Sequence, residues 1–91
     1  MKKLQYCVYV LQSQEDGKLY IGFTTDLNRR LTEHIKGYSK ATAPRRPFEL
    51  VFAEFYKAKG DALRRESYFK TQKGKRTLRL MLKESLQEIK A

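Results

Sequence analysis

Five side chains of this 91-residue sequence have the chemical character of a catalytic set, although they lie far apart along the chain. Two are phenols, and the others are a guanidinium, an imidazole and a carboxylate. A phenol or an imidazole can move a proton, a guanidinium can stabilise charge on a phosphate, and a carboxylate can hold a divalent metal ion. The set therefore predicts metal-assisted cleavage of a phosphodiester, provided that the fold gathers its members. They are Tyr9, Tyr20, Arg30, His34 and Glu66.

The two phenols lie on stretches that are typical of β-strands. Residues 6–11 and 19–23 are rich in aromatic and β-branched types, and an Asp-Gly pair at positions 16 and 17 favours a turn between them. We therefore expect an antiparallel hairpin. With its loop centred between positions 14 and 15, Tyr9 would lie opposite Tyr20, on one face of the sheet, and Gly22 would leave space beside Tyr20.

The guanidinium and the imidazole lie on a stretch with helical signals. Thr25 and Asp26 are good N-caps, and Gly37 is a common type of helix terminator. Arg30 and His34 are four residues apart on this helix and so share one side, next to an apolar stripe. We expect that stripe, consisting of Leu27, Leu31 and Ile35, to face the core.

The second half of the chain predicts one more strand and two more helices. Residues 48–56 form a long, largely apolar run, which indicates a central or well-covered strand. A helix is expected over residues 59–73 with Gly74 just past its end, and a last amphipathic helix over residues 77–89. The apolar face of the last helix consists of Leu78, Met81, Leu82, Leu86 and Ile89.

Glu66 falls within the expected inward face of the helix over residues 59–73, beside Ala62, Leu63 and Phe69. An unpaired charge in such surroundings is costly, so a compensating group is expected. Two explanations remain open, namely an ion pair with Arg30 or another arginine, and a bound metal ion. The other four residues also have ordinary alternatives, as sheet aromatics or as solvated helix residues, but their combination favours a catalytic site.

The charge balance favours an anionic polymer as the partner. Twenty Lys and Arg residues face ten Asp and Glu residues, which gives a formal net charge of +10. Nucleic acid is the leading candidate, with little sequence preference because no base-reading motif accompanies the charge. We expect DNA, branched or flapped, while RNA stays open because phosphate contacts do not distinguish the sugars. The candidate nucleic-acid-binding residues are Lys40, Arg45, Arg46, Arg64, Arg65, Lys70, Lys73, Lys75 and Arg76.

Composition argues against several other classes of protein. No apolar run approaches the length of about 18 residues that a spanning helix needs, and the N-terminus lacks a signal-peptide core, so we expect no membrane association and a cytoplasmic location, nucleoid-associated if the protein is bacterial. Cys7 is the single cysteine, which predicts no disulfide-linked partner and no structural zinc site. We expect it to be a small apolar residue within a strand. Residues 1–91 are expected to form one domain.

Two tripeptides, at residues 7–9 and 20–22, resemble the paired signature of the GIY-YIG nuclease superfamily, with Cys and Val in place of the first glycine and isoleucine. Arg30, His34 and Glu66 follow at the intervals of the family's pattern. The chain is most similar to small stand-alone bacterial members, and its first half is similar to the N-terminal nuclease domain of the excinuclease. The resemblance implies an α+β fold with a three-stranded antiparallel sheet flanked by helices, in the order β-β-α-β-α-α.

The resemblance also implies an activity, that of a DNA endonuclease dependent on Mg²⁺ (or Mn²⁺) and acting in repair or recombination. Tyr9 would be the general base, Tyr20 would bind the attacking water or the phosphate, and Arg30 would offset phosphate charge. Glu66 would hold one metal ion, and His34 would assist the phosphate or relay a proton. A free tyrosine has a pKa of about 10, so the site must lower the pKa of Tyr9 or share its proton. The alternative is a catalytically inactive nucleic-acid-binding module of the same fold.

Overall fold

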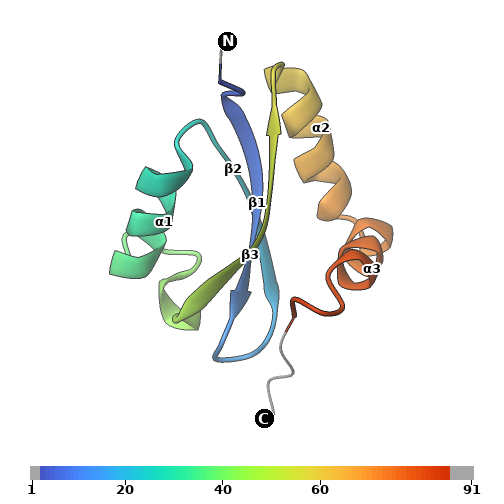
Figure 1. Ribbon diagram of the computed structural model, residues 1–91. Coiled ribbons are helices and arrows are strands. Elements are labelled where there is room, and N and C mark those ends of the chain that lie inside the picture. Colours follow the sequence, from blue (N-terminus) through green and yellow to red (C-terminus); the bar gives the residue numbers. More distant parts are fainter. Residues whose placement is uncertain (1–2, 87–91) are drawn as a thin grey trace.

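A three-stranded antiparallel sheet with helices on both faces forms the structure, a computed structural model that describes residues 3–86 (Figure 1). The strands are β1 (Tyr6–Ser13), β2 (Leu19–Thr24) and β3 (Phe48–Tyr56). Helix α1 (Leu27–Lys36) covers one face, while α2 (Lys59–Phe69) and α3 (Gln72–Met81) cover the other. This arrangement confirms the predicted α+β class and element order. Within residues 3–86, no helix has the length and apolar character needed to cross a membrane.

The sheet has the strand order β2-β1-β3, so β1 is central and β3 is an edge strand. The prediction that residues 48–56 form a central or well-covered strand was therefore wrong. Side chains of β3 such as Leu50 and Phe55 are exposed, whereas every residue of β1 after Tyr6 is buried. Apolar content did not distinguish the two strands, because position in a sheet depends on which partners each strand acquires.

The β1–β2 hairpin pairs Tyr9 with Gly22 and Leu11 with Tyr20, so the prediction that Tyr9 lies opposite Tyr20 was wrong. The turn is centred one residue later than expected, because Gly17 adopts a left-handed conformation (φ 74°) and its N–H donates to the Ser13 carbonyl at 2.8 Å. The resulting offset along the partner strand is two residues. Since side chains alternate with a period of two, both phenols still lie on the same face of the sheet.

Gly22 makes room for Tyr9, and not for Tyr20 as the sequence suggested. A Cβ atom at position 22 would lie 2.3 Å from Cζ of the Tyr9 ring and 2.4 Å from its hydroxyl oxygen. Any side chain there would push the ring aside. The glycine of the second tripeptide therefore sets the position of the phenol in the first.

Helix α1 begins and ends where its sequence signals predict. The Asp26 carboxylate accepts the N–H of Arg29 at 3.1 Å, and Gly37 ends the helix with φ 77°. The expected inward stripe was wrong in one position, because Ile35 is 72% exposed. His34 takes the inward position instead, and a count of apolar residues alone does not detect it.

The chain over residues 59–81 forms two helices separated at residues 70–71, in contrast to the predicted helix over residues 59–73. The Thr71 hydroxyl accepts the N–H of Gly74 at 3.0 Å and so caps the start of α3. Gly74 consequently lies inside α3, where a Cβ atom would be 1.9 Å from the Tyr68 carbonyl oxygen. The glycine thus permits close packing of α2 and α3 and does not mark a helix end.

The last helix is also placed differently from the prediction, since it begins at Gln72 and ends at Met81. Leu78 and Leu82 are buried as expected, whereas Met81 is exposed. On α2, Ala62 and Phe69 are buried as expected, but the inward placement of Leu63 was wrong because its side chain is exposed. Leu86 is partly buried against the core, and Ile89 lies outside the described residues.

The sheet separates two apolar clusters, one on each of its faces. Under α2 and α3, alternate residues of β1 pack with those two helices and with Ile21. The buried residues of this cluster are Val8, Val10, Ile21, Ala62, Phe69, Leu78 and Leu82. Under α1, the cluster consists of Cys7, Tyr9 and Leu11 with Leu27 and Leu31 packed against them. The period-two alternation of β1 therefore places Tyr9 on the α1 face.

Candidate active site

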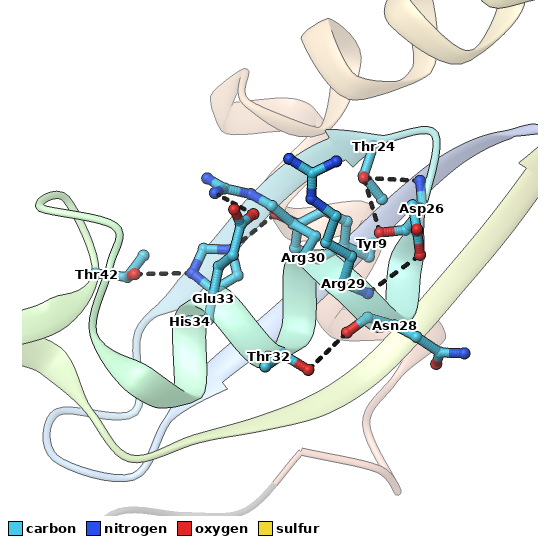
Figure 2. Close-up of polar contacts among 10 residues, drawn as sticks. All are labelled: Tyr9, Thr24, Asp26, Asn28, Arg29, Arg30, Thr32, Glu33, His34 and Thr42. Carbon is cyan, nitrogen blue, oxygen red and sulfur yellow. Dashed lines mark hydrogen bonds and ion pairs between the residues drawn. The ribbon is translucent and has the colours of Figure 1, made fainter.

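The hydroxyl of Tyr9 is the centre of a hydrogen-bonded cluster between β1 and α1 (Figure 2). His34 Nε2 lies 2.8 Å from this oxygen, and Arg30 Nε donates to it at 3.3 Å. Tyr9 is 0% exposed and His34 is 1% exposed. The spacing of four residues places Arg30 and His34 one turn apart on α1, which lets both side chains reach one phenol.

Tyr20 lies at the side of the same cluster. Its ring centroid is 5.2 Å from that of His34 and 6.4 Å from that of Tyr9. Phe48 contacts the imidazole on another side, with centroids 6.4 Å apart. The structure therefore brings four of the five sequence-predicted residues together, with aromatic rings surrounding the imidazole.

Thr42 completes the cluster, although no pattern in the sequence indicates it as a site residue. Its Oγ1 lies 2.8 Å from His34 Nδ1, and the residue is fully buried. It precedes the short 3-10 helix η1 (Ala43–Arg45). A polar loop residue eight positions after His34 has no periodic relation to it, so only the path of the loop reveals the contact.

Arg30 also forms an ion pair, with its Nη1 atom 3.2 Å from the carboxylate of Glu33. The expectation that Arg30 could pair with Glu66 was therefore wrong. Burial acts to lower the pKa of Arg30, but hydrogen bonds to Tyr9 and Glu33 raise it above its ordinary value. The guanidinium is thus a permanent cation, and its side chain is about one-third exposed next to the phenol.

Both proton-carrying groups of the cluster are neutral near pH 7. Burial raises the pKa of Tyr9 to about 12, although the hydrogen bond from Arg30 acts in the opposite direction. Burial, and then the charge of Arg30, lower the pKa of His34 below its ordinary value. The environment therefore disfavours a resting phenolate, which leaves sharing of the Tyr9 proton as the route to a base.

Glu66 stands apart from this cluster. It lies on α2, which packs on the face of the sheet opposite α1 (Figure 1), and its side chain is 18% exposed. Its carboxylate accepts from Lys70 Nζ at 3.1 Å. The compensating cation is thus a lysine on the following turn and not an arginine. Among the described residues, no hydrogen bond or ion pair joins Glu66 to Tyr9, Tyr20, Arg30 or His34.

The predicted catalytic set offers one carboxylate, that of Glu66, as a ligand for a hard divalent ion. Among residues 3–86, no three His, Cys, Asp or Glu side chains form a metal-binding group. Mg²⁺, however, keeps most of its waters and often needs one or two carboxylates besides the substrate's phosphate. Glu66 supplies one such carboxylate, and its pair with the exposed Lys70 is of the weak kind that a stronger ligand can displace.

The predicted nucleic-acid-binding residues divide into two groups. Some are committed to the fold: Arg65 binds Glu54 through two bonds of 3.0 Å, and Arg46 donates to the Ile35 and Ala43 carbonyl oxygens. Arg64 and Lys70 pair with acidic residues on α2, and Arg45 pairs with Asp16 at 3.5 Å. The exposed cations without a partner described above are Lys40, Lys73, Lys75 and Arg76.

A basic cleft of about 290 Å³ lies where the hairpin turn approaches α3. The cations that line it are Lys18, Arg45, Lys75 and Arg79. A second cleft, of about 330 Å³, lies beside Arg30 and includes Arg29 and Glu33. The cleft next to α3 is thus strongly basic, whereas in the cleft beside Arg30 the two arginines are matched by the carboxylates of Asp26 and Glu33.

Comparisons with known proteins give consistent results. A family model described as the GIY-YIG catalytic domain matches residues 5–79. Proteins named UPF0213 protein from Staphylococcus aureus strains Mu3 and N315 are each 41% identical over 75 residues, which is 81% of this chain and 90% of theirs. The solution NMR structure of a UPF0213 protein from Bacillus halodurans is similar with a TM-score of 0.55 and 35% identity, covering 84% of this chain and 83% of that one.

Proposed function

Because the chain belongs to the GIY-YIG catalytic domain family, and so carries a nuclease-type domain, we propose that it is a Mg²⁺-dependent DNA endonuclease that hydrolyses phosphodiester bonds. The observation that carries this proposal is the buried contact of Tyr9 with both His34 and Arg30. A phenol placed between an imidazole and a guanidinium can pass a proton to one and lie next to the positive charge of the other. General-base catalysis on a phosphate needs both properties.

The proton path follows from the two hydrogen bonds of Tyr9. As a water oxygen forms a bond to phosphorus, the Tyr9 oxygen takes a proton from that water and passes its own proton to His34 Nε2. The bond from phosphorus to the 3′-oxygen breaks, and that oxygen takes a proton from solvent. Arg30 offsets the charge that grows on the non-bridging oxygens, and the Tyr20 hydroxyl orients the water or the phosphate.

Access to Tyr9 depends on Arg30, because the phenol is fully buried in the free protein. The Arg30–Glu33 pair lies at the adjoining cleft and is about one-third exposed. A phosphate that replaces Glu33 as the partner of Arg30 would draw the guanidinium outward and open a path to the phenol. Substrate binding and exposure of the base would then be one event.

Glu66 is the residue that would hold Mg²⁺ (or Mn²⁺). Because α2 packs on the face of the sheet opposite α1, this assignment requires a substrate that reaches both Glu66 and the Tyr9 cluster. A bound ion supplies Lewis-acid stabilisation of the leaving oxygen. A substrate phosphate is needed to complete such a site, because a single carboxylate is a weak ligand set by itself.

DNA is the proposed substrate, with the shape of a branch or flap deciding the choice more than its sequence. The exposed cations Lys73, Lys75 and Arg76 on α3 are suited to the sugar-phosphate backbone, which carries no sequence information. Such an activity belongs in repair or recombination, in the cytoplasm or on a nucleoid. RNA is the substrate to test beside it.

The proposal is tested with branched DNA, linear DNA and RNA, each with Mg²⁺ or with a chelator, scoring binding and cleavage separately. Glu66→Gln removes the charge without changing the shape, and Asp61→Asn makes the same change on the same helix as a control. We expect metal-dependent cleavage by the wild type and by Asp61→Asn, with a fall of at least about 100-fold for Glu66→Gln. Unchanged cleavage by Glu66→Gln would refute the metal assignment.

A second function, binding of nucleic acid without turnover, is favoured by the full burial of Tyr9 and by its raised pKa. In that case the same assay shows retained affinity without product at any metal concentration. The two functions are therefore separated by cleavage alone, since both predict binding.

A further inference from the structure

The hydrogen-bond partners of Tyr9 decide which nitrogen of His34 carries the proton. Among the described residues, the partners of the Tyr9 hydroxyl are His34 Nε2 and Arg30 Nε. A guanidinium nitrogen only donates, so it cannot accept the phenol's proton. Tyr9 is neutral near pH 7 and fully buried, so this proton has one acceptor, His34 Nε2.

The other ring nitrogen must then carry the imidazole's proton. A neutral imidazole has one N–H, and Nε2 is needed as the acceptor for Tyr9, so the N–H is at Nδ1. Thr42 Oγ1, at 2.8 Å, is the partner of Nδ1 in the described structure. The Nδ1–H group therefore donates to the threonine hydroxyl.

We propose that Thr42 is a positioning residue for proton transfer, whose hydroxyl oxygen holds His34 in the tautomer that leaves Nε2 free to accept from Tyr9. The role of Thr42 in proton transfer rests on the proposed function, whereas the assignment of the His34 tautomer does not. Thr42 touches no substrate and acts through the imidazole.

The geometry of the loop indicates that the hydroxyl is not required to hold the loop itself. The Thr42 N–H donates to the Ser39 carbonyl at 3.2 Å, and the Thr42 carbonyl accepts from Arg45 at 2.9 Å. Backbone hydrogen bonds thus fix the turn, and the hydroxyl contacts His34. Both nitrogens of a buried imidazole then have a partner, which avoids the cost of an unsatisfied group.

Thr42 also suits the charged form of the imidazole. After Tyr9 passes its proton on, Nε2–H donates back to the phenol oxygen while Nδ1–H keeps the same bond to Thr42. No side chain has to turn during the transfer, so the reorganisation cost is small. The groups that face His34 are the rings of Tyr9, Tyr20 and Phe48 with the charges of Arg30 and Glu33.

The substitution Thr42→Val tests this proposal, because valine keeps the shape and removes the acceptor, and Thr42→Ser is the control that restores it. His34 is the single histidine of the chain, so its imidazole ¹⁵N NMR signals can be assigned without ambiguity. We expect the Nδ1–H tautomer in the wild type and in Thr42→Ser, and a shift towards Nε2–H in Thr42→Val. An Nε2–H tautomer in the wild type would overturn the proposal, and that result does not depend on whether the valine variant folds.

Cleavage supplies the second measurement. We expect Thr42→Val to lower kcat by about tenfold or more with KM unchanged, and Thr42→Ser to restore it. A valine variant with the altered tautomer and full kcat would refute the positioning role. If the wild type shows Nδ1–H but neither it nor the variants cleave, the tautomer assignment stands and the proposed endonuclease function fails, so the two failures are distinguishable.

Discussion

Replacement of Gly22 by alanine should disable the candidate site from a position that carries no functional group. The new Cβ atom would lie 2.3 Å from Tyr9 Cζ, whereas ordinary contact begins near 3.4 Å, so the ring must move by about 1.1 Å. Tyr9 is fully buried beneath α1 and has little room to move. Overpacking of this kind costs about 1–3 kcal/mol. Loss of the hydrogen bond to His34 adds about 1 kcal/mol.

The prediction is measured by urea unfolding and by cleavage of branched DNA with Mg²⁺. Gly60→Ala is the matched control, because Arg64 Nη1 at 4.0 Å is its one neighbour within 4 Å and the glycine lies in a helix, where alanine is tolerated. We expect Gly22→Ala to lose about 2–4 kcal/mol of stability and most of its activity, and Gly60→Ala to lose neither. A Gly22→Ala variant with wild-type stability and cleavage would refute the argument that this glycine positions the phenol.

Three further predictions follow from the contacts described above. Tyr9→Phe should lower cleavage by about 100-fold or more while the fold is retained by circular dichroism, and wild-type turnover would exclude Tyr9 as the base. Because the pKa of His34 is lowered in the folded state, the unfolded chain takes up the proton first as the pH falls. Urea unfolding should therefore show that the stability of the wild type falls as the pH drops below about 6.5. His34→Gln should lack this part of the pH dependence, and a profile identical to that of the wild type would contradict the assignment to His34. Arg65→Lys should cost about 1 kcal/mol because lysine cannot keep both bonds to Glu54, whereas Arg64→Lys on the same helix should cost less than about 0.5 kcal/mol; equal effects would contradict the structural role of Arg65.

The commitment of Arg65 to the fold limits the charge that is free for nucleic acid. Its guanidinium lies 4.2 Å from the centroid of the Phe69 ring and forms an ion pair with Glu54. Because Glu54 is on β3, this arginine links α2 to the sheet. A formal charge of +10 therefore overstates the number of cations available to a phosphate backbone. We therefore expect the salt dependence of nucleic-acid affinity to reflect the number of exposed lysines and arginines on α3 rather than the total charge of the chain.

Local patterns in the sequence were sufficient for much of the site. Alternation along two strands placed Tyr9 and Tyr20 on one face, and this result survived an error in register because the offset was even. The spacing of Arg30 and His34 placed both on one side of α1, whose caps at Asp26 and Gly37 were also correct. Each of these features depends on residues close together in the chain, so period and propensity determine it.

Other features required the tertiary structure, because they depend on contacts between distant residues. Burial between two partners made β1 central and left β3 at the edge, although both sequences are apolar. Close approach to the Tyr68 carbonyl explains Gly74 inside α3, where the sequence signal indicated a helix end. The carboxylate of Glu66 forms its ion pair with Lys70 and not with an arginine.

The chemistry of the site divides in the same way. The sequence by itself determined which reactive groups exist, on which elements they lie, and that they resemble a nuclease set. The tertiary structure decided that the phenol is buried, that its proton points to an imidazole, and that a loop threonine holds the opposite side of that ring. Burial and hydrogen-bond direction are properties of the packed chain, because each depends on atoms that only folding brings together.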